Sequence, residues 1–153
     1  AYAARMQAGL LAHWPTEILV EWLHRHNLET ERYAFLRFEA LHFRKEAWLL
    51  ERIPGREAFY DPSFCDNFTD VERRARGPND WLAKYMLERG TWNTPIILLE
   101  NPDGIIAFPN GEQLKSPHHL LEGHRRLSFL NGLRITGKAN SKHDVWVASL
   151  RKL

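Results

Sequence analysis

The stretch LLEGHRRLSFLNGL, residues 120–133, decides the fold that this sequence predicts. It contains a short apolar run, a glycine, and a helix that we expect to stop at Asn131-Gly132, because glycine tolerates the left-handed conformation of a helix end. A junction of strand, glycine and helix presents several backbone N–H groups and the positive end of the helix dipole at one point. The stretch therefore predicts a place where an anion can bind.

Two arginines, Arg125 and Arg126, open this helix. Cations in a first helical turn are unfavourable by roughly 0.3–1 kcal/mol each, because they face the positive end of the dipole. An anion at the turn would explain them, since guanidinium groups bind phosphate oxygens through paired hydrogen bonds. The alternative interpretation is that Gly123 only makes a turn and that both arginines are solvated.

The segments on either side extend the pattern. Upstream, we expect a helix that is capped by Asn79 and stopped by Gly90. A turn at residues 101–104 separates two of the expected strands. Strands are expected where short apolar runs lie between turn residues, at residues 95–99, 105–108, 118–121 and 144–150.

This order of elements, with Gly123-His124-Arg125-Arg126 at its centre, resembles the ParB/sulfiredoxin superfamily over about residues 79–150. Sulfiredoxins carry a catalytic cysteine just before a His-Arg pair, whereas this chain has Gly123 there. The resemblance is therefore to the ParB-like nuclease or NTPase type and not to the peroxiredoxin-repair enzymes. It implies an α+β fold, in which a small mixed sheet packs against helices.

We expect two parts in the chain, divided at Ile53-Pro54-Gly55. Residues 55–153 would form the ParB/sulfiredoxin-like domain, and residues 1–54 an N-terminal helical extension. Within the extension, Pro15-Thr16 opens a helix that Asn27 ends, with Trp22 and His26 as packing residues. Residues 31–53 fit no single period, and their Glu content favours helix.

The segment that follows the division is expected to be a loop from Gly55 to Asp66 that holds the one cysteine, Cys65, as a bystander thiol. A short helix then begins at Thr69, which has the form of a capping box with Glu72.

The resemblance also implies a site. A nucleoside triphosphate, with ATP as the first candidate, would place its phosphates on Gly123, His124, Arg125 and Arg126, while Thr94 and Pro95 line the base side. Hydrolysis of the nucleotide or of DNA would require Mg²⁺ or another divalent metal, with Glu122 as its ligand. Glu122, His124, Arg125 and Arg126 are the candidate catalytic residues, although His124 stands where other ParB-like proteins often have an acidic residue. The alternative role of Glu122 is as a partner of either arginine.

Charge is distributed unevenly along the chain. Residues 118–153 contain seven Lys or Arg against two Asp or Glu, a net charge of +5, whereas residues 1–117 carry −3. An anionic ligand requires such a concentration of positive charge. The same concentration predicts that the last third of the chain binds DNA without sequence preference.

Two further functions compete with this reading. A plasmid-encoded fertility-inhibition protein of the oncogenic-suppression (Osa) kind would share this fold and block conjugal DNA transfer by binding a protein partner of the transfer apparatus. The other is a metal site made by His118, His119 and His124. Adjacent strand residues point to opposite faces of a sheet, so His118 and His119 cannot easily share one ion.

Composition bounds the remaining possibilities. The chain has 153 residues, an apolar share of 44% and a single cysteine, which indicates a real hydrophobic core and no internal disulfide. No apolar run approaches the ~20 residues of a membrane span. We expect a cytoplasmic protein, whose true N-terminus precedes Ala1.

Overall fold

The computed structural model describes residues 9, 11–26 and 30–150. Within this part of the chain, four strands form one mixed sheet in the order β1-β4-β2-β3. Their bounds are Leu41–Leu49 for β1, Ile96–Glu100 for β2, His118–Glu122 for β3 and Lys142–Leu150 for β4. β4 runs antiparallel to β1 and parallel to β2, and β2 runs antiparallel to β3. The expected α+β class with a small mixed sheet is confirmed.

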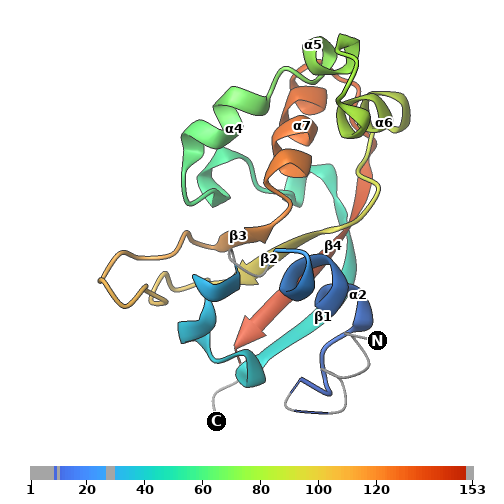
Figure 1. Ribbon diagram of the computed structural model, residues 1–153. Coiled ribbons are helices and arrows are strands. Elements are labelled where there is room, and N and C mark those ends of the chain that lie inside the picture. Colours follow the sequence, from blue (N-terminus) through green and yellow to red (C-terminus); the bar gives the residue numbers. More distant parts are fainter. Residues whose placement is uncertain (1–8, 10, 27–29, 151–153) are drawn as a thin grey trace.

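Helical elements cover both faces of the sheet (Figure 1). On one face lie α4 (Pro62–Phe68), α5 (Val71–Arg76), α6 (Trp81–Arg89) and α7 (His124–Ile135). On the other face lie α2 (Thr16–Ile18), which continues as the π-helical turn η1 (Leu19–His24), and the 3₁₀ turns η2 (Ala34–Leu36) and η3 (Phe38–Ala40). The short 3₁₀ turns η4 (Leu50–Arg52) and η5 (Arg56–Ala58) connect β1 to α4.

Each face of the sheet has its own hydrophobic core. Ile96, Leu98 and Leu120 pack among the residues of α4–α7, whereas Ile97 and Leu121 pack with the N-terminal segment around Trp14 and Trp22. Because both faces are covered, β2 and β3 can be apolar without alternation. This arrangement explains the continuous run Ile96–Leu99, and the expectation of buried strands at residues 95–99 and 118–121 is confirmed.

The segment before residue 54 differs from the expectation. Residues 41–49 are a strand and not a helix, because β1 pairs along its whole length with β4. β1 is an edge strand with several half-exposed positions, so its apolar residues do not alternate strictly. Local sequence favoured helix there, and tertiary pairing overrode it. The sheet thus runs across the boundary expected at residue 54, and the segment before that boundary is not purely helical.

α7 is longer than expected. It begins after Gly123 as predicted but runs through Asn131 and Gly132 to Ile135. Gly132 does not stop the helix; it lets α7 approach the end of α4 so closely that a Cβ there would overlap the Thr69 carbonyl oxygen. A glycine in a helix can thus mark close packing as well as a C-terminus.

Two smaller expectations are also corrected. Residues 55–66 are not one loop, because η5 and α4 form within them; Asp61 caps α4 and Cys65 lies buried in it. The expected strand at residues 105–108 is absent from the described structure, where residues 101–117 form a loop with a single bridge between Ala107 and Gln113.

The helix caps lie one residue later than expected. Asp70 caps α5 in place of Thr69, and Asp80 caps α6 in place of Asn79. Gly90 ends α6 in the left-handed conformation, as predicted. The expected helix end at Asn27 lies outside the described residues. No helix in the described ranges is long and apolar enough to cross a membrane.

Candidate functional site

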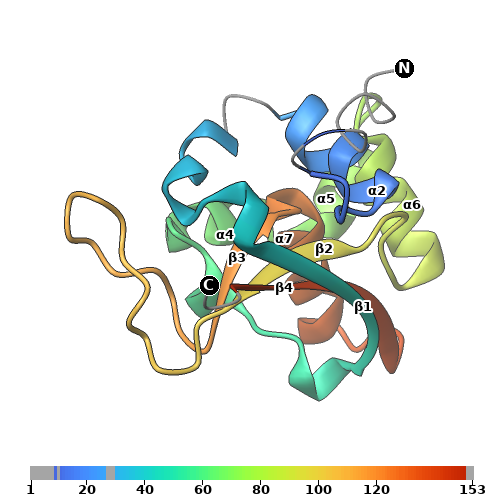
Figure 2. The same ribbon diagram turned by 90° about the horizontal axis from the view of Figure 1, so that it is seen from below.

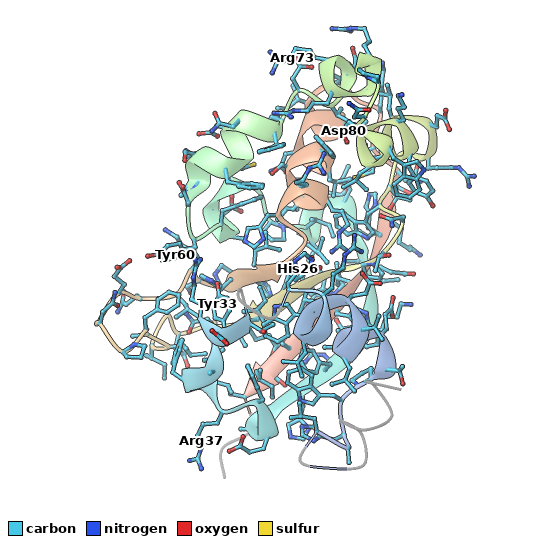
Figure 3. The ribbon with its side chains drawn as sticks, in the orientation of Figure 1. His26, Tyr33, Arg37, Tyr60, Arg73 and Asp80 are labelled. Carbon is cyan, nitrogen blue, oxygen red and sulfur yellow. The ribbon has the colours of Figure 1, made fainter. Side chains whose placement is uncertain are left out.

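A cleft of about 620 Å³ opens where β3 ends and α7 begins. It lies between η1 and the residues after it on one side and the first residues of α6 on the other, so parts of the chain far apart in sequence form its walls. Figure 3 shows three of its lining residues, His26, Tyr60 and Asp80, which come from three different segments. The full lining is Glu21, Arg25, His26, Arg32, Tyr60, Asp61, Phe64, Asn79, Asp80, Trp81, Leu82, Asn93, Thr94, Leu121, Glu122, Gly123, His124, Arg125 and Arg126.

Gly123 is the turn at the base of the cleft. Its φ of +99° lies in the left-handed region, and a Cβ at this position would come within 2.5 Å of the Ile96 Cγ2 atom. Both observations require glycine. Among the described residues, no side chain caps the N-terminus of α7. The first-turn N–H groups therefore stand at the cleft with the positive end of the helix dipole.

Arg126 is buried beneath this turn and is occupied by protein groups. Its Nη1 donates to the carbonyl oxygens of Thr94 (2.6 Å) and Pro95 (2.9 Å), and its Nη2 donates to the Glu122 carboxylate. It thus ties the start of α7 to the segment that enters β2. The structure brings Thr94 and Arg126 together in the cleft wall, while Pro95 lies buried behind it.

Glu122 lies between Arg126 and His26. Its Oε2 accepts from Arg126, and its Oε1 lies 3.5 Å from the Nε2 atom of His26. His26 was expected to pack in the core, but its side chain is 40% exposed and faces the cleft. The carboxylate can therefore orient the imidazole of a residue that lies 96 positions earlier in the chain.

Arg125 is the more accessible of the two arginines. Its side chain is 45% exposed, and its Nη2 donates to Asp80 Oδ2 over 2.7 Å. The guanidinium also lies over the rings of Phe68 and Phe129, at 5.7 and 5.4 Å from their centroids. The Asp80 side chain is only 12% exposed, so the half-exposed guanidinium of Arg125 is the side of this pair that another anion can reach.

His124 lines the cleft beside two phenylalanines. Its ring meets those of Phe59 and Phe64 edge to face, with centroids 5.8 and 5.6 Å apart. This packing holds the imidazole against the aromatic wall. The structure therefore places His124 at the expected site.

The other two histidines of the competing metal site lie elsewhere. The His119 side chain is fully buried, with its Nδ1 accepting from the Lys115 N–H and its Nε2 bonded to the Tyr33 hydroxyl over 2.8 Å. A backbone N–H can only donate, so neutral His119 carries its proton on Nε2. Burial lowers the pKa of His119 to about 4. His118 packs instead against Trp48 on the opposite face.

Glu122, the residue expected to hold a divalent metal, is in contact with other side chains of the cleft. In the described ranges, no group of three or more His, Cys, Asp or Glu side chains is placed to hold a metal ion. The Glu122 carboxylate, the expected ligand, has Arg126 and His26 against its two oxygens. Arg126 and His26 would therefore compete with Mg²⁺ for the oxygens of this carboxylate.

The positive charge of the last third is offset by acids from other parts of the chain. Arg125 pairs with Asp80 and Lys138 with Glu72, whereas Arg126 pairs with Glu122 of the same segment. Arg134 donates to the carbonyl oxygens of Leu50 and Ile53, and burial lowers its pKa. The net charge of this segment in the sequence therefore overstates the charge that it presents.

Sequence reasoning missed the residues that the N-terminal segment and α6 bring to the cleft. His26, Tyr60, Asp80 and Trp81 all line it. The sequence predicted a cap before α6 at Asn79, but it did not indicate that Asp80 would be the cap and would lie beside Arg125. No local signal pointed to His26.

Comparison with known proteins adds no relatives: no protein-family model, curated protein or solved structure gives a significant match to this chain.

Proposed function

We propose that the cleft binds a nucleoside triphosphate, with ATP as the first candidate, and hydrolyses it. The observation that carries the proposal is the uncapped N-terminus of α7 at Gly123, which opens into a cleft of about 620 Å³. A helix N-terminus in a concave site attracts phosphate through its free N–H groups and its dipole. The volume falls within the roughly 300–1,000 Å³ of typical small-molecule sites.

The two arginines have different roles in this proposal. Arg125 is half-exposed and exchanges its pair with Asp80 for a phosphate oxygen. Arg126 stays in place, because its hydrogen bonds to Thr94, Pro95 and Glu122 hold the turn together. Arg126 is thus a positioning residue, and Arg125 is the phosphate ligand.

The base of the nucleotide has an aromatic surface available. Trp81, which is 61% exposed, and Tyr60 both line the cleft. Planar rings at a cleft rim stack on a nucleobase without selecting its identity. This feature supports a nucleotide over a simple phosphate ester.

Hydrolysis requires charge neutralisation and an oriented water molecule. Arg125 and the N–H groups of α7 supply the first. His26, whose Nε2 lies 3.5 Å from the Glu122 carboxylate, supplies the second, because a neutral imidazole can accept a proton from water. His124, the residue expected from the sequence, also lines the cleft and is the alternative base. A requirement for a divalent metal stays a prediction.

The resemblance to the ParB/sulfiredoxin superfamily is part of the proposal. The succession α6, β2, β3, α7 and β4, with Gly123 and two arginines opening α7, supports a ParB-like fold. A nucleotide site in such a fold, associated with DNA, suits a DNA-handling NTPase or nuclease.

The test is calorimetric titration with ATP, CTP and GTP, with and without Mg²⁺. Arg125→Ala should weaken binding about tenfold or more, as loss of a charge-assisted contact does. Arg76→Ala removes an exposed arginine that does not line the cleft and is the matched control. Equal affinity in wild type and Arg125→Ala rules out the site.

Turnover is tested separately from binding. His26→Gln should retain nucleotide affinity and lose most ATP hydrolysis. His124→Gln should retain ATP hydrolysis if His26 is the base. Assays with chelator report the metal requirement. If the wild type binds nucleotide and does not hydrolyse it, the protein is a nucleotide-binding protein and the proposed enzymatic activity is wrong.

A regulator that acts by binding a protein partner is the second candidate, and one observation favours it. The loop of residues 101–117 projects from the sheet beyond β2 and β3 (Figure 2), and its Ile105 side chain is 75% exposed. A regulator of the fertility-inhibition kind would keep full activity in Arg125→Ala and lose it in Ile105→Asp. The proposed nucleotide enzyme requires the opposite pattern.

A further inference from the structure

A second hollow of about 490 Å³ adjoins the cleft at its α5–α6 side. The two share Asn79, Asp80 and Arg125 as lining residues, so they are adjacent. The hollow is lined by Arg73, Arg74, Gly77, Pro78, Asn79, Asp80 and Arg125. In Figure 3, Arg73 and Asp80 lie near each other at the α5–α6 end of the molecule. A ligand longer than a mononucleotide can thus extend from the cleft into the hollow.

The hollow is more positive than the cleft. Its described lining contains three arginines and one carboxylate, that of Asp80. Asp80 is already engaged, because Oδ1 accepts from the Ala83 N–H and Oδ2 from Arg125. The cleft lining holds four aspartates or glutamates and four arginines. An anion is therefore attracted more strongly to the hollow than to the cleft as a whole.

The arginines of the hollow have spare capacity to bind an anion. The Arg73 side chain is 67% exposed, and its closest acidic group, Asp70, is 4.0 Å away. Arg74 donates to the Asn67 carbonyl over a long 3.5 Å, and its buried Nε has no hydrogen-bond partner among the described residues.

Aromatic packing fixes two of these guanidinium groups. Arg74 and Arg125 both lie over the Phe68 ring, at 4.2 and 5.7 Å from its centroid. A phosphate that reaches both guanidinium groups would be attracted by two positive charges. Because the groups are held before any ligand arrives, little side-chain entropy is lost on binding.

An exposed indole stands beside the hollow. Trp81 follows Asp80, the residue shared by cleft and hollow, and its ring rests against Tyr85 with centroids 5.3 Å apart. Most of its surface faces solvent, although burial of an indole is favourable. An unstacked nucleobase is a natural partner for such a ring.

We infer that cleft and hollow together bind single-stranded nucleic acid. One phosphate lies at the N-terminus of α7, the next backbone phosphate lies beside Arg73 and Arg74, and a base stacks on Trp81. Arg125, which lines both the cleft and the hollow, lies between the two phosphates. The inference rests on the proposed function, in which the cleft takes a nucleotide phosphate. A duplex does not fit, because its bases are already stacked on both sides and offer no face to Trp81.

Fluorescence anisotropy with labelled oligonucleotides of about 12 nucleotides tests the inference, a length within the site sizes of single-strand binding surfaces. Oligothymidylate and oligouridylate are compared with a duplex of equal length, and the tighter of the two single strands identifies the sugar. Trp81→Ala should weaken single-strand binding at least about fivefold, the lower end of what one stacked base contributes. Ile135→Ala, which removes another exposed apolar side chain, is the control and should have no effect.

Salt dependence tests the hollow itself. Arg73→Gln should reduce the slope of log affinity against log salt by about 0.7, the value for one phosphate contact of a single strand. Arg76→Gln, on the same helix but outside both linings, should leave the slope unchanged. Both arginines are exposed, so neither variant should compromise folding.

Several outcomes would overturn the inference. They are duplex binding as tight as single-strand binding, equal affinity in Trp81→Ala and Ile135→Ala, and equal salt slopes in Arg73→Gln and Arg76→Gln. Binding of ATP without binding of oligonucleotide removes the inference and leaves the proposed function intact. Oligonucleotide binding that depends on Trp81 and Arg73, without binding of free triphosphates, would support the inference that single-stranded nucleic acid binds here. It would also exclude the nucleoside triphosphate as the ligand.

Discussion

Gly123 is the residue on which the site depends, and its environment was only half visible in the sequence. The sequence predicted a turn and a helix start at this position, and both are present. It did not indicate that Ile96 would lie against the position of a Cβ at Gly123, because Ile96 begins β2 whereas Gly123 follows β3. Local chemistry predicts backbone conformation better than it predicts close packing between segments.

Replacing Gly123 by alanine should destabilise the protein more than the same change at Gly111. Both glycines have positive φ, +99° and +93°, so both variants carry the strain of a left-handed alanine, about 1–2 kcal/mol. A Cβ at Gly111 meets nothing within 4 Å, whereas one at Gly123 meets Ile96. Overpacking should add about 1–3 kcal/mol for Gly123→Ala. Urea unfolding of the two variants measures the difference, and equal destabilisation would show that Ile96 moves aside freely.

His119 should make the protein sensitive to acid. Burial lowers its pKa from 6.5 to about 4, so the unfolded chain binds a proton in this range that the folded chain does not. Stability is therefore full above about pH 6.5 and is lost as pH falls toward 4, by up to about 3 kcal/mol. Burial also lowers the pKa values of His118 and His143, which adds to the effect.

Unfolding free energies measured from neutral pH down to about pH 4 test this expectation. In His119→Gln the loss of stability over that range should be smaller than in the wild type, whatever the stability of the variant at neutral pH. An unchanged pH slope would assign the acid sensitivity to other groups.

At the scale of elements, the apolar runs predicted β2, β3 and β4, and the glycine turn predicted the start of α7. β1 was missed because an edge strand with charged residues such as Arg44 and Lys45 lacks the alternation that identifies a strand. The end of α7 was missed for a different reason. Gly132 is a residue type that commonly ends helices, yet here it allows the Thr69 carbonyl group to pack closely against α7.

Asp80 links an element to the site, because it caps α6 and also pairs with Arg125. Asp80→Ala should lose both roles and cost about 1 kcal/mol of stability, the usual effect of a lost cap. Asp80→Asn keeps a cap and loses the charge, so stability should change little. Arg125 is then released, and anion affinity should rise.

Calorimetry with inorganic pyrophosphate distinguishes the two Asp80 variants from the wild type. Tighter binding in both is expected, with a stability loss in Asp80→Ala only. Weaker binding in Asp80→Asn would mean that the carboxylate positions Arg125 for the ligand and does not compete with it.

At the scale of the whole molecule, the cleft exists because the N-terminal segment packs on one face of the sheet and α4–α7 on the other (Figure 1). Sequence reasoning placed the arginine turn correctly within the fold and could not place His26 opposite it. The pairing of His26 with Glu122 depends on how two cores meet across one sheet, and no spacing in the chain encodes it.

The two-core arrangement predicts where the molecule is most rigid. β2 and β4 are paired on both sides and buried on both faces, whereas residues 101–117 form a loop with few backbone hydrogen bonds to the sheet. Amide hydrogen exchange should be slowest in β2 and β4 and fast around Ile105. Fast exchange in β4 would show that the sheet opens at its centre.

The position of β4 has a consequence for the order in which the chain is made. β4 leaves the ribosome after the other three described strands, yet it lies between β1 and β2 and supplies the only strand pairing of β1 in the described structure. During synthesis, residues 41–49 therefore wait unpaired while about a hundred residues are added, and their backbone donors and acceptors are open to other nascent chains. A chaperone that shields this strand until β4 arrives would raise the yield of folded protein without ever touching the cleft.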